Sequence, residues 1–85
     1  MVYNILITDE AKREIRKKID KSLLDRLDKA INKLSLAPES YGKPLHYPLV
    51  GFWETYFDRR YRILYKIDIN TRTITIEAIK HKDDM

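Results

Sequence analysis

The alternation of apolar and polar residues divides the chain into one short strand, two helices and three further strands. Residues 2–7 are rich in β-branched and aromatic side chains, which favours a strand. Apolar residues then recur with helical spacing, first at Ala11, Ile15 and Ile19, and then at Leu23, Leu27, Ala30, Ile31 and Leu34. Thr8 and Ser22 are placed to cap these helices, and Pro38 ends the second. The pattern predicts an antiparallel helix hairpin.

Three strands are expected after the helices, at residues 52–58, 61–69 and 72–81. A glycine and two prolines within residues 41–50 favour an irregular, edge-like segment before them. Strands joined by only a few residues must be antiparallel neighbours. We therefore expect a single α+β domain spanning the chain, with both helices on one face of a small sheet that ends in a three-stranded antiparallel meander.

Strict alternation along these strands assigns their side chains to two faces. The core face is expected to hold Trp53, Thr55, Phe57, Tyr61, Ile63, Tyr65, Ile67, Ile69, Ile74, Ile76 and Ala78. The other face is expected to hold Glu54, Tyr56, Asp58, Arg62, Leu64, Lys66, Asp68, Thr75, Glu77, Ile79 and His81. Because a helix hairpin covers only one side, this second face should be open. Its arginine, Arg62, either pairs with Glu54 or Glu77 or binds an anion.

Charge and composition narrow the classes of partner and site. The 17 Lys and Arg exceed the 13 Asp and Glu, which gives a net charge of +4 and favours polyanionic partners, although a mixed, solvated surface has the same composition. With no cysteine and only two histidines, we expect no disulfide, metal site or cofactor. No apolar run is long enough to span a membrane and no targeting segment is evident, so a cytoplasmic protein is expected.

The first helix carries a separate cluster of basic residues. Its members are Lys12, Arg13, Arg16, Lys17, Lys18 and Lys21. Charge runs of this kind are usually solvated helix faces. On a nucleic-acid target the same residues would contact phosphates, and binding would weaken as the salt concentration rises.

Three stretches resemble the RelE/ParE toxin superfamily in order and spacing. They are Leu49-Val50-Gly51-Phe52-Trp53-Glu54, Tyr61-Arg62-Ile63-Leu64-Tyr65 and Ile79-Lys80-His81-Lys82. The order of predicted elements also fits over residues 3–82. The resemblance implies the toxin of a toxin–antitoxin pair, with an antitoxin protein as partner. In the RelE branch it implies an endonuclease that cleaves mRNA on the ribosome.

The resemblance also implies roles for single residues. Arg62 corresponds to the arginine that grips the scissile phosphate, His81 to a histidine found in many relatives, and Lys82 to the basic residue that follows it. Tyr56 stands where many relatives have a basic residue. The tyrosine that many relatives carry shortly after the histidine is replaced here by Asp83-Asp84-Met85.

These residue types suit metal-independent cleavage of RNA by its own 2′-hydroxyl. An imidazole such as that of His81 accepts or donates a proton near neutral pH, and a guanidinium such as that of Arg62 binds two phosphate oxygens at once. Tyr56 is expected either to stack on a base or to serve structurally by half covering the sheet, rather than to act as a base, while Lys43, Arg60 and Lys66 would add cations for RNA binding.

Two alternatives remain open from the sequence. One is a ParE-like protein that poisons DNA gyrase by binding, without chemistry. The other is an attenuated toxin that only binds its antitoxin. The arginine, histidine and lysine set favours the endonuclease, and the missing tyrosine favours the alternatives.

Overall fold

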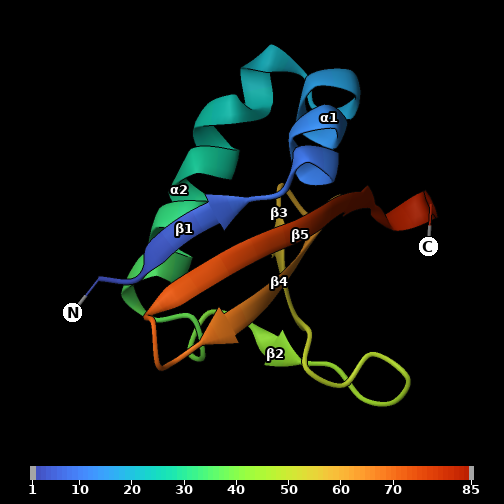
Figure 1. Ribbon diagram of the computed structural model, residues 1–85. Coiled ribbons are helices and arrows are strands. Elements are labelled where there is room, and N and C mark those ends of the chain that lie inside the picture. Colours follow the sequence, from blue (N-terminus) through green and yellow to red (C-terminus); the bar gives the residue numbers. More distant parts are fainter. Residues whose placement is uncertain (1, 85) are drawn as a thin grey trace.

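The computed structural model describes residues 2–84, which form a mixed sheet covered on one side by helices (Figure 1). In chain order the elements are β1 (Asn4–Ile7), α1 (Asp9–Lys18), the 3-10 turn η1 (Lys21–Leu23), α2 (Leu24–Leu36), β2 (Lys43–Pro44), β3 (Trp53–Phe57), β4 (Tyr61–Asp68), β5 (Thr73–His81) and the 3-10 turn η2 (Lys82–Asp84). The predicted α+β class, the helix hairpin and the three-stranded meander are confirmed.

The five strands lie in the order β1-β5-β4-β3-β2. All neighbouring pairs are antiparallel except β1 and β5, which are parallel, with Asn4 opposite Thr73 and Ile7 opposite Ile76. The first strand of the chain therefore lies beside the fifth, a pairing that the sequence pattern leaves unassigned. β1 and β2 form the two edges of the sheet.

The helix ends follow local sequence signals, with one exception. The Thr8 hydroxyl accepts a hydrogen bond from the Ala11 N–H at 3.1 Å and caps α1 as predicted, and α2 ends at Leu36, ahead of Pro38. The predicted cap at Ser22 is wrong. The chain instead enters α2 through η1, where the Asp20 carboxylate accepts a hydrogen bond from the Ser22 N–H at 3.4 Å.

The core lies between the helices and the sheet. Its buried apolar residues are Ala11, Ile19, Leu27, Leu34, Phe57, Ile63, Tyr65, Ile74, Ile76 and Ile79. The largest of them, Tyr65, donates its hydroxyl hydrogen to the Pro38 carbonyl at 2.7 Å, which anchors the end of α2 to β4. Gly42 crosses this hydroxyl so closely that a side chain there would overlap it. Ile69, predicted to lie in the core, is 65% exposed because β4 ends at Asp68.

A bulge in β5 changes which residues reach the core. Leu64 lies opposite Ala78 but Tyr65 lies opposite Ile76, so Glu77 is an extra residue without a partner in β4. Beyond this point the alternation of faces is reversed. Ile79 is 1% exposed and packs in the core. The assignments of Ala78 to the core face and of Ile79 and His81 to the open face are therefore wrong.

Candidate functional site

The open face of the sheet brings Tyr56 and Arg62 together from adjacent strands. Tyr56 on β3 lies directly opposite Arg62 on β4, and Arg62 lies opposite Lys80 on β5. Directly opposed residues of antiparallel strands point to the same face. Tyr56 is 52% exposed, so its ring is available to a partner. These two predicted site residues lie on the predicted face.

Arg62 forms an ion pair across the strands. Its Nε contacts Oε2 of Glu54, and the two side chains are only 19% and 17% exposed. Of the two explanations that the sequence leaves open for this arginine, pairing with Glu54 is the one present in the structure. Partial burial strengthens such a pair relative to a fully solvated one. An anion that binds Arg62 must therefore compete with the groups that already contact the guanidinium.

His81 lies on the opposite side of the sheet from Arg62. Its ring meets the ring of Tyr61 edge-on, with 5.2 Å between the ring centroids, and Tyr61 points to the core face. The His81 Nδ1 lies 3.2 Å from the Asp83 backbone nitrogen, within hydrogen-bonding distance, and 3.5 Å from Oδ2 of the Asp83 carboxylate. The structure does not bring His81 into one cluster with Arg62 and Tyr56. The bulge at Glu77 reverses the alternation of faces along β5, so the His81 side chain points to the core face instead of the open face.

Lys82 and Arg60 lie next to each other at one end of the sheet. β5 stops at His81, and the Lys82 N–H donates a hydrogen bond to the Arg60 carbonyl at 2.8 Å. Arg60 belongs to the turn between β3 and β4, and its guanidinium pairs with the Asp58 carboxylate at 2.9 Å. Arg26 of α2 contacts the same carboxylate. The hydrogen bond from Arg60 lowers the pKa of Asp58, with Arg26 contributing in the same direction.

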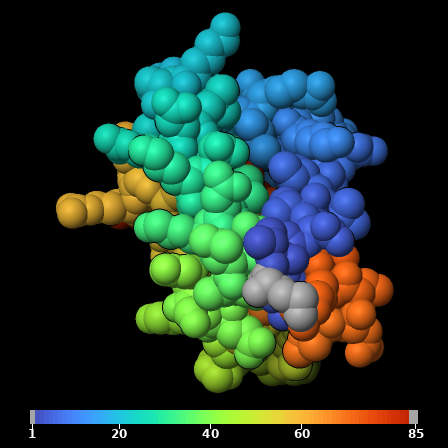
Figure 2. All heavy atoms as spheres, turned by 90° about the vertical axis from the view of Figure 1, so that its left-hand side faces the viewer, coloured from blue at the N-terminus to red at the C-terminus, as the bar shows by residue number. Residues whose placement is uncertain are grey.

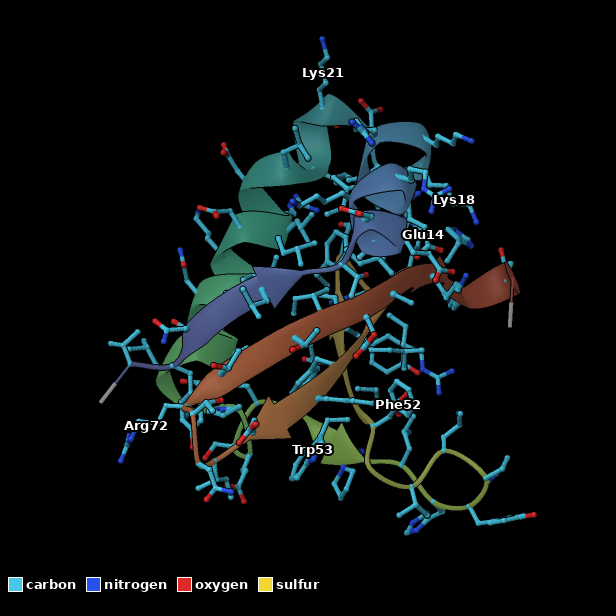
Figure 3. The ribbon with its side chains drawn as sticks, in the orientation of Figure 1. Glu14, Lys18, Lys21, Phe52, Trp53 and Arg72 are labelled. Atoms are coloured by element: carbon cyan, nitrogen blue, oxygen red, sulfur yellow. The ribbon has the colours of Figure 1, made fainter. Side chains whose placement is uncertain are left out.

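The remaining predicted RNA-binding residues lie on the same side as Arg62 or at the edge strand. The Lys66 Nζ lies 4.6 Å from the centre of the Phe52 ring, a cation–π contact, and Figure 3 shows Phe52 beside β4. Lys43 is exposed on β2, opposite Glu54 of β3. The basic cluster of the first helix is solvent-exposed, with Lys21 on η1 and its other members on α1.

A further basic row, on α2, is absent from the sequence-based site. Arg26, Lys29 and Lys33 line a hollow of about 350 Å³ between α2 and β3, together with Tyr41 and Tyr56. A second hollow of about 350 Å³ continues on the other side of Tyr41 and reaches Lys43. The signal was present in the sequence, because positions 26, 29 and 33 share one helix face.

Metal-ligand clusters and membrane-spanning helices are both absent from the part of the chain that the structure describes. Among residues 2–84, no three acidic or histidine side chains lie together as ligands for a metal ion. None of the helices in that range is both long and apolar enough to cross a membrane.

Comparison with known proteins identifies the family. The family model described as the ParE toxin of the type II toxin–antitoxin system parDE matches residues 5–85. Toxin RelG of Mycobacterium tuberculosis is 34% identical over 87 residues, an alignment that covers 100% of this chain and 97% of RelG.

Solved structures agree with this assignment. A chain of the RelBE2 toxin–antitoxin complex of M. tuberculosis matches with a TM-score of 0.84 and 31% identity, covering 95% of this chain and 99% of that one. The archaeal RelE–RelB complex of Pyrococcus horikoshii contains a chain with the same fold, with a TM-score of 0.76 at 16% identity and full coverage (100%) of both chains. The chain therefore belongs to the RelE/ParE family of toxins of type II toxin–antitoxin systems.

Proposed function

We propose that this toxin is an endonuclease that cleaves mRNA on the ribosome and so inhibits translation. The observation that carries the proposal is the placement of Arg62 directly opposite Tyr56 on the sheet face that the helices leave open. The 34% identity to Toxin RelG over the whole chain supports the RelE-type activity over other activities of the family.

In this proposal the open face binds the RNA backbone and a base. The planar guanidinium of Arg62 offers five N–H donors in a fixed fork, which suits the two oxygens of a phosphate. Tyr56, half-exposed beside it, offers a flat ring for stacking. Glu54 holds Arg62 until the phosphate replaces the carboxylate as its partner. The positive charge of Arg62 is therefore paired with an anion both before RNA binds, with the Glu54 carboxylate, and afterwards, with the phosphate.

In this proposal His81 accepts the proton of the attacking 2′-hydroxyl, and the ammonium group of Lys82, the next residue, donates a proton to the departing 5′ oxygen. Attack of the 2′-hydroxyl on phosphorus needs a proton acceptor, and departure of the 5′ oxygen needs a donor. The strands stop at His81, with Lys82 and Arg60 side by side at that end. We place the RNA strand across this end, where its phosphates can reach Arg62 on one face and its sugar can reach His81 on the other.

A second candidate function is inhibition of DNA gyrase by binding alone. Two observations favour it: the family model that matches residues 5–85 is the ParE toxin, and Arg62 and His81 lie on opposite faces of the sheet. A binding protein needs no convergence of these groups. The antitoxin-binding surface and the fold would be the same in either case.

Two assays run in parallel separate the candidates. After induction, primer extension on cellular mRNA should show cuts at defined positions within translated regions. Purified toxin should leave supercoiling by gyrase unaffected. The reverse pair of results, inhibited supercoiling with intact mRNA, would assign the chain to the ParE-like activity.

We also propose that a cognate antitoxin neutralises the toxin. The solved relatives from M. tuberculosis and P. horikoshii are toxin–antitoxin complexes. The net charge of +4 suits a partner with acidic segments. Purification from the native cell should recover the chain with a small protein in a fixed ratio. Repeated recovery of the chain alone would contradict this part of the proposal.

A further inference from the structure

Three aromatic side chains form a row across the core face of the sheet, at the end where β5 stops. Phe57 of β3 lies directly opposite Tyr61 of β4, and Tyr61 lies directly opposite His81 of β5. The Phe57 and Tyr61 rings stack with 5.0 Å between their centroids, and the Tyr61 and His81 rings meet at 90° with 5.2 Å between theirs. Both distances are typical of favourable aromatic contacts. The row therefore connects the buried Phe57 to the histidine at the rim.

Tyr61, the middle member of the row, is held from two sides. Phe57 belongs to the core and supports one side of its ring. The Tyr61 hydroxyl donates a hydrogen bond at 3.2 Å to the carbonyl of Lys18, the last residue of α1. Carbonyls in the last turn of a helix lack partners within the helix, so this bond satisfies one of them. In Figure 2 the blue residues of α1 pack against the teal residues of α2, so the helix that accepts the bond is itself held in place.

His81 is less constrained by its own strand. It is the last residue of β5, and its side chain is 28% exposed. Such a side chain exchanges between staggered rotamers unless a neighbour excludes the alternatives. The Tyr61 ring is that neighbour, because it lies directly beside the imidazole. The Nδ1 atom faces the backbone nitrogen and the carboxylate of Asp83, so Nε2 is the ring nitrogen left to meet a substrate.

We infer that Tyr61 is a positioning residue, which orients the His81 imidazole to take the proton of the 2′-hydroxyl. The inference rests on the proposed function for the role of His81 as proton acceptor. Proton transfer requires the accepting nitrogen within hydrogen-bonding reach of the hydroxyl. A histidine that divides its time among several rotamers meets this condition less often, and the chemical step slows accordingly. Tyr61 acts only through its contact with the histidine ring.

Two substitutions separate the ring of Tyr61 from its hydroxyl. Tyr61→Leu removes the ring but keeps an apolar side chain, and on ribosomes programmed with mRNA it should lower kcat about tenfold while KM stays within about twofold. Tyr61→Phe should keep kcat within about threefold of wild type, because Phe57 still supports the ring.

The matched control makes the same substitution at the other end of the sheet. Tyr3 also packs against the core, but it precedes Asn4, which pairs with Thr73 at the start of β5. Tyr3→Leu should therefore leave kcat within about twofold of wild type.

Nuclear magnetic resonance of the free toxin tests the positioning without any cleavage. The chain has two histidines, His81 and the exposed His46, so isotope-labelled imidazoles give two sets of signals, and His46 serves as an internal reference. Magnetisation should transfer between the ring protons of His81 and those of Tyr61 in the wild type, or of the phenylalanine in Tyr61→Phe. The order parameter of the His81 ring should be about 0.85 in both proteins and fall below about 0.6 in Tyr61→Leu.

Three kinetic outcomes would overturn the positioning role: an unchanged kcat in folded Tyr61→Leu, equal losses in Tyr61→Leu and Tyr61→Phe, or equal losses in Tyr61→Leu and Tyr3→Leu. If Tyr61→Leu does not fold, the wild-type spectrum decides, and a His81 ring as mobile as that of His46 overturns the inference. A wild-type toxin that cuts no mRNA but has an ordered His81 ring in contact with Tyr61 refutes only the endonuclease. One that cuts mRNA with a mobile His81 ring refutes only the positioning.

Discussion

Arg62 allows the effect of one side chain on activity to be separated from its effect on stability. We expect Arg62→Ala to lower mRNA cleavage about a hundredfold, because a preorganised cation at the phosphate is lost. Stability should fall by only about 1 kcal/mol, since Glu54 loses its partner but no core cavity opens. Cleavage assays and urea unfolding measure the two effects.

Glu54→Gln is the matched control for this experiment. It breaks the same ion pair but leaves the arginine in place, so cleavage should persist. Arg62→Lys should rescue only part of the activity, because an ammonium cannot reproduce the forked contact. Equal loss of cleavage in Glu54→Gln and Arg62→Ala would mean that the pair, rather than the cation, is required.

Tyr56 tests whether an aromatic face or a hydroxyl is needed. If it stacks on a base, Tyr56→Phe should keep most of the activity, and Tyr56→Ala should weaken RNA binding by about 1–3 kcal/mol. The ring is half-exposed and lies outside the core, so neither change should unfold the protein. Loss of cleavage in the phenylalanine variant with normal RNA binding would point to a chemical role for the hydroxyl.

The buried Tyr65 should lower the stability of the folded protein at alkaline pH. Burial raises the pKa of Tyr65 from 10.0 to about 12. Between these two values the unfolded state loses the proton while the folded state keeps it, so the stability falls as the pH rises, by about 2–3 kcal/mol in all. Urea unfolding from pH 9 to pH 12 should show this slope. Tyr65→Phe should flatten it, at the cost of the hydrogen bond to Pro38.

The limits of sequence-based prediction are clearest at His81. Arg62 and Tyr56 were placed correctly, because β3 and β4 alternate without interruption. His81 is assigned to the wrong face, because strict alternation takes no account of the extra residue at the Glu77 bulge. A signal existed, since Ile74, Ile76 and Ile79 are apolar at spacings of two and then three. A three-residue step inside a strand is the pattern that a bulge leaves.

At the scale of elements, local signals predicted the two α-helices and every strand except the two-residue β2, but not every pairing. Helix caps, apolar periodicity and short turns act over a few residues, and they predicted α1, α2, β3, β4 and β5 to within two residues at most ends. The position of β1 beside β5 depends on contacts between residues far apart in sequence, such as Ile5 and Ile74. No local pattern encodes such a partner.

Beyond the end of β1, a side chain of α1 supplies the hydrogen-bond acceptor that the exposed edge of β5 needs. β1 ends at Ile7, and beyond it the Glu14 carboxylate accepts a hydrogen bond from the Ile79 N–H at 3.1 Å and pairs with the Lys80 ammonium at 2.8 Å. Figure 3 shows Glu14 on α1 next to the end of β5. A carboxylate thus replaces the carbonyls that a longer β1 would have provided.

We expect Glu14→Ala to destabilise the protein by about 2–3 kcal/mol, because a buried N–H loses its acceptor and Lys80 its carboxylate. Glu14→Gln should cost less, since its amide oxygen can still accept from Ile79. Glu10→Ala, an exposed change one turn earlier, serves as the control and should lie within about 0.5 kcal/mol of wild type. A stability change in Glu14→Ala as small as that of the control would show that the contact is dispensable.

At the scale of the whole molecule, positive charge is divided among the open face, the hollow beside α2 and the exposed helix α1. Toxin bound to ribosomes should dissociate as salt rises, with the logarithm of the binding constant falling linearly in the logarithm of salt concentration. If α1 contacts rRNA, Lys12→Ala with Arg16→Ala should reduce that slope by about one to two. Sedimentation of ribosomes with labelled toxin measures it. An unchanged slope would leave the α1 cluster as a solvated face.

The parallel pairing of β1 with β5 also sets the order in which the toxin can become active. Synthesis proceeds from the N-terminus, so β1 leaves the ribosome long before its partner exists. Until residues 73–81 have emerged, β4 lacks its inner neighbour and β1 lacks any neighbour in the sheet. Pairings between distant parts of a chain are also slow to form. If the toxin cleaves mRNA on the ribosome as proposed, a ribosome that is synthesising it is therefore shielded, because the nascent chain lacks the complete sheet that the proposed site requires.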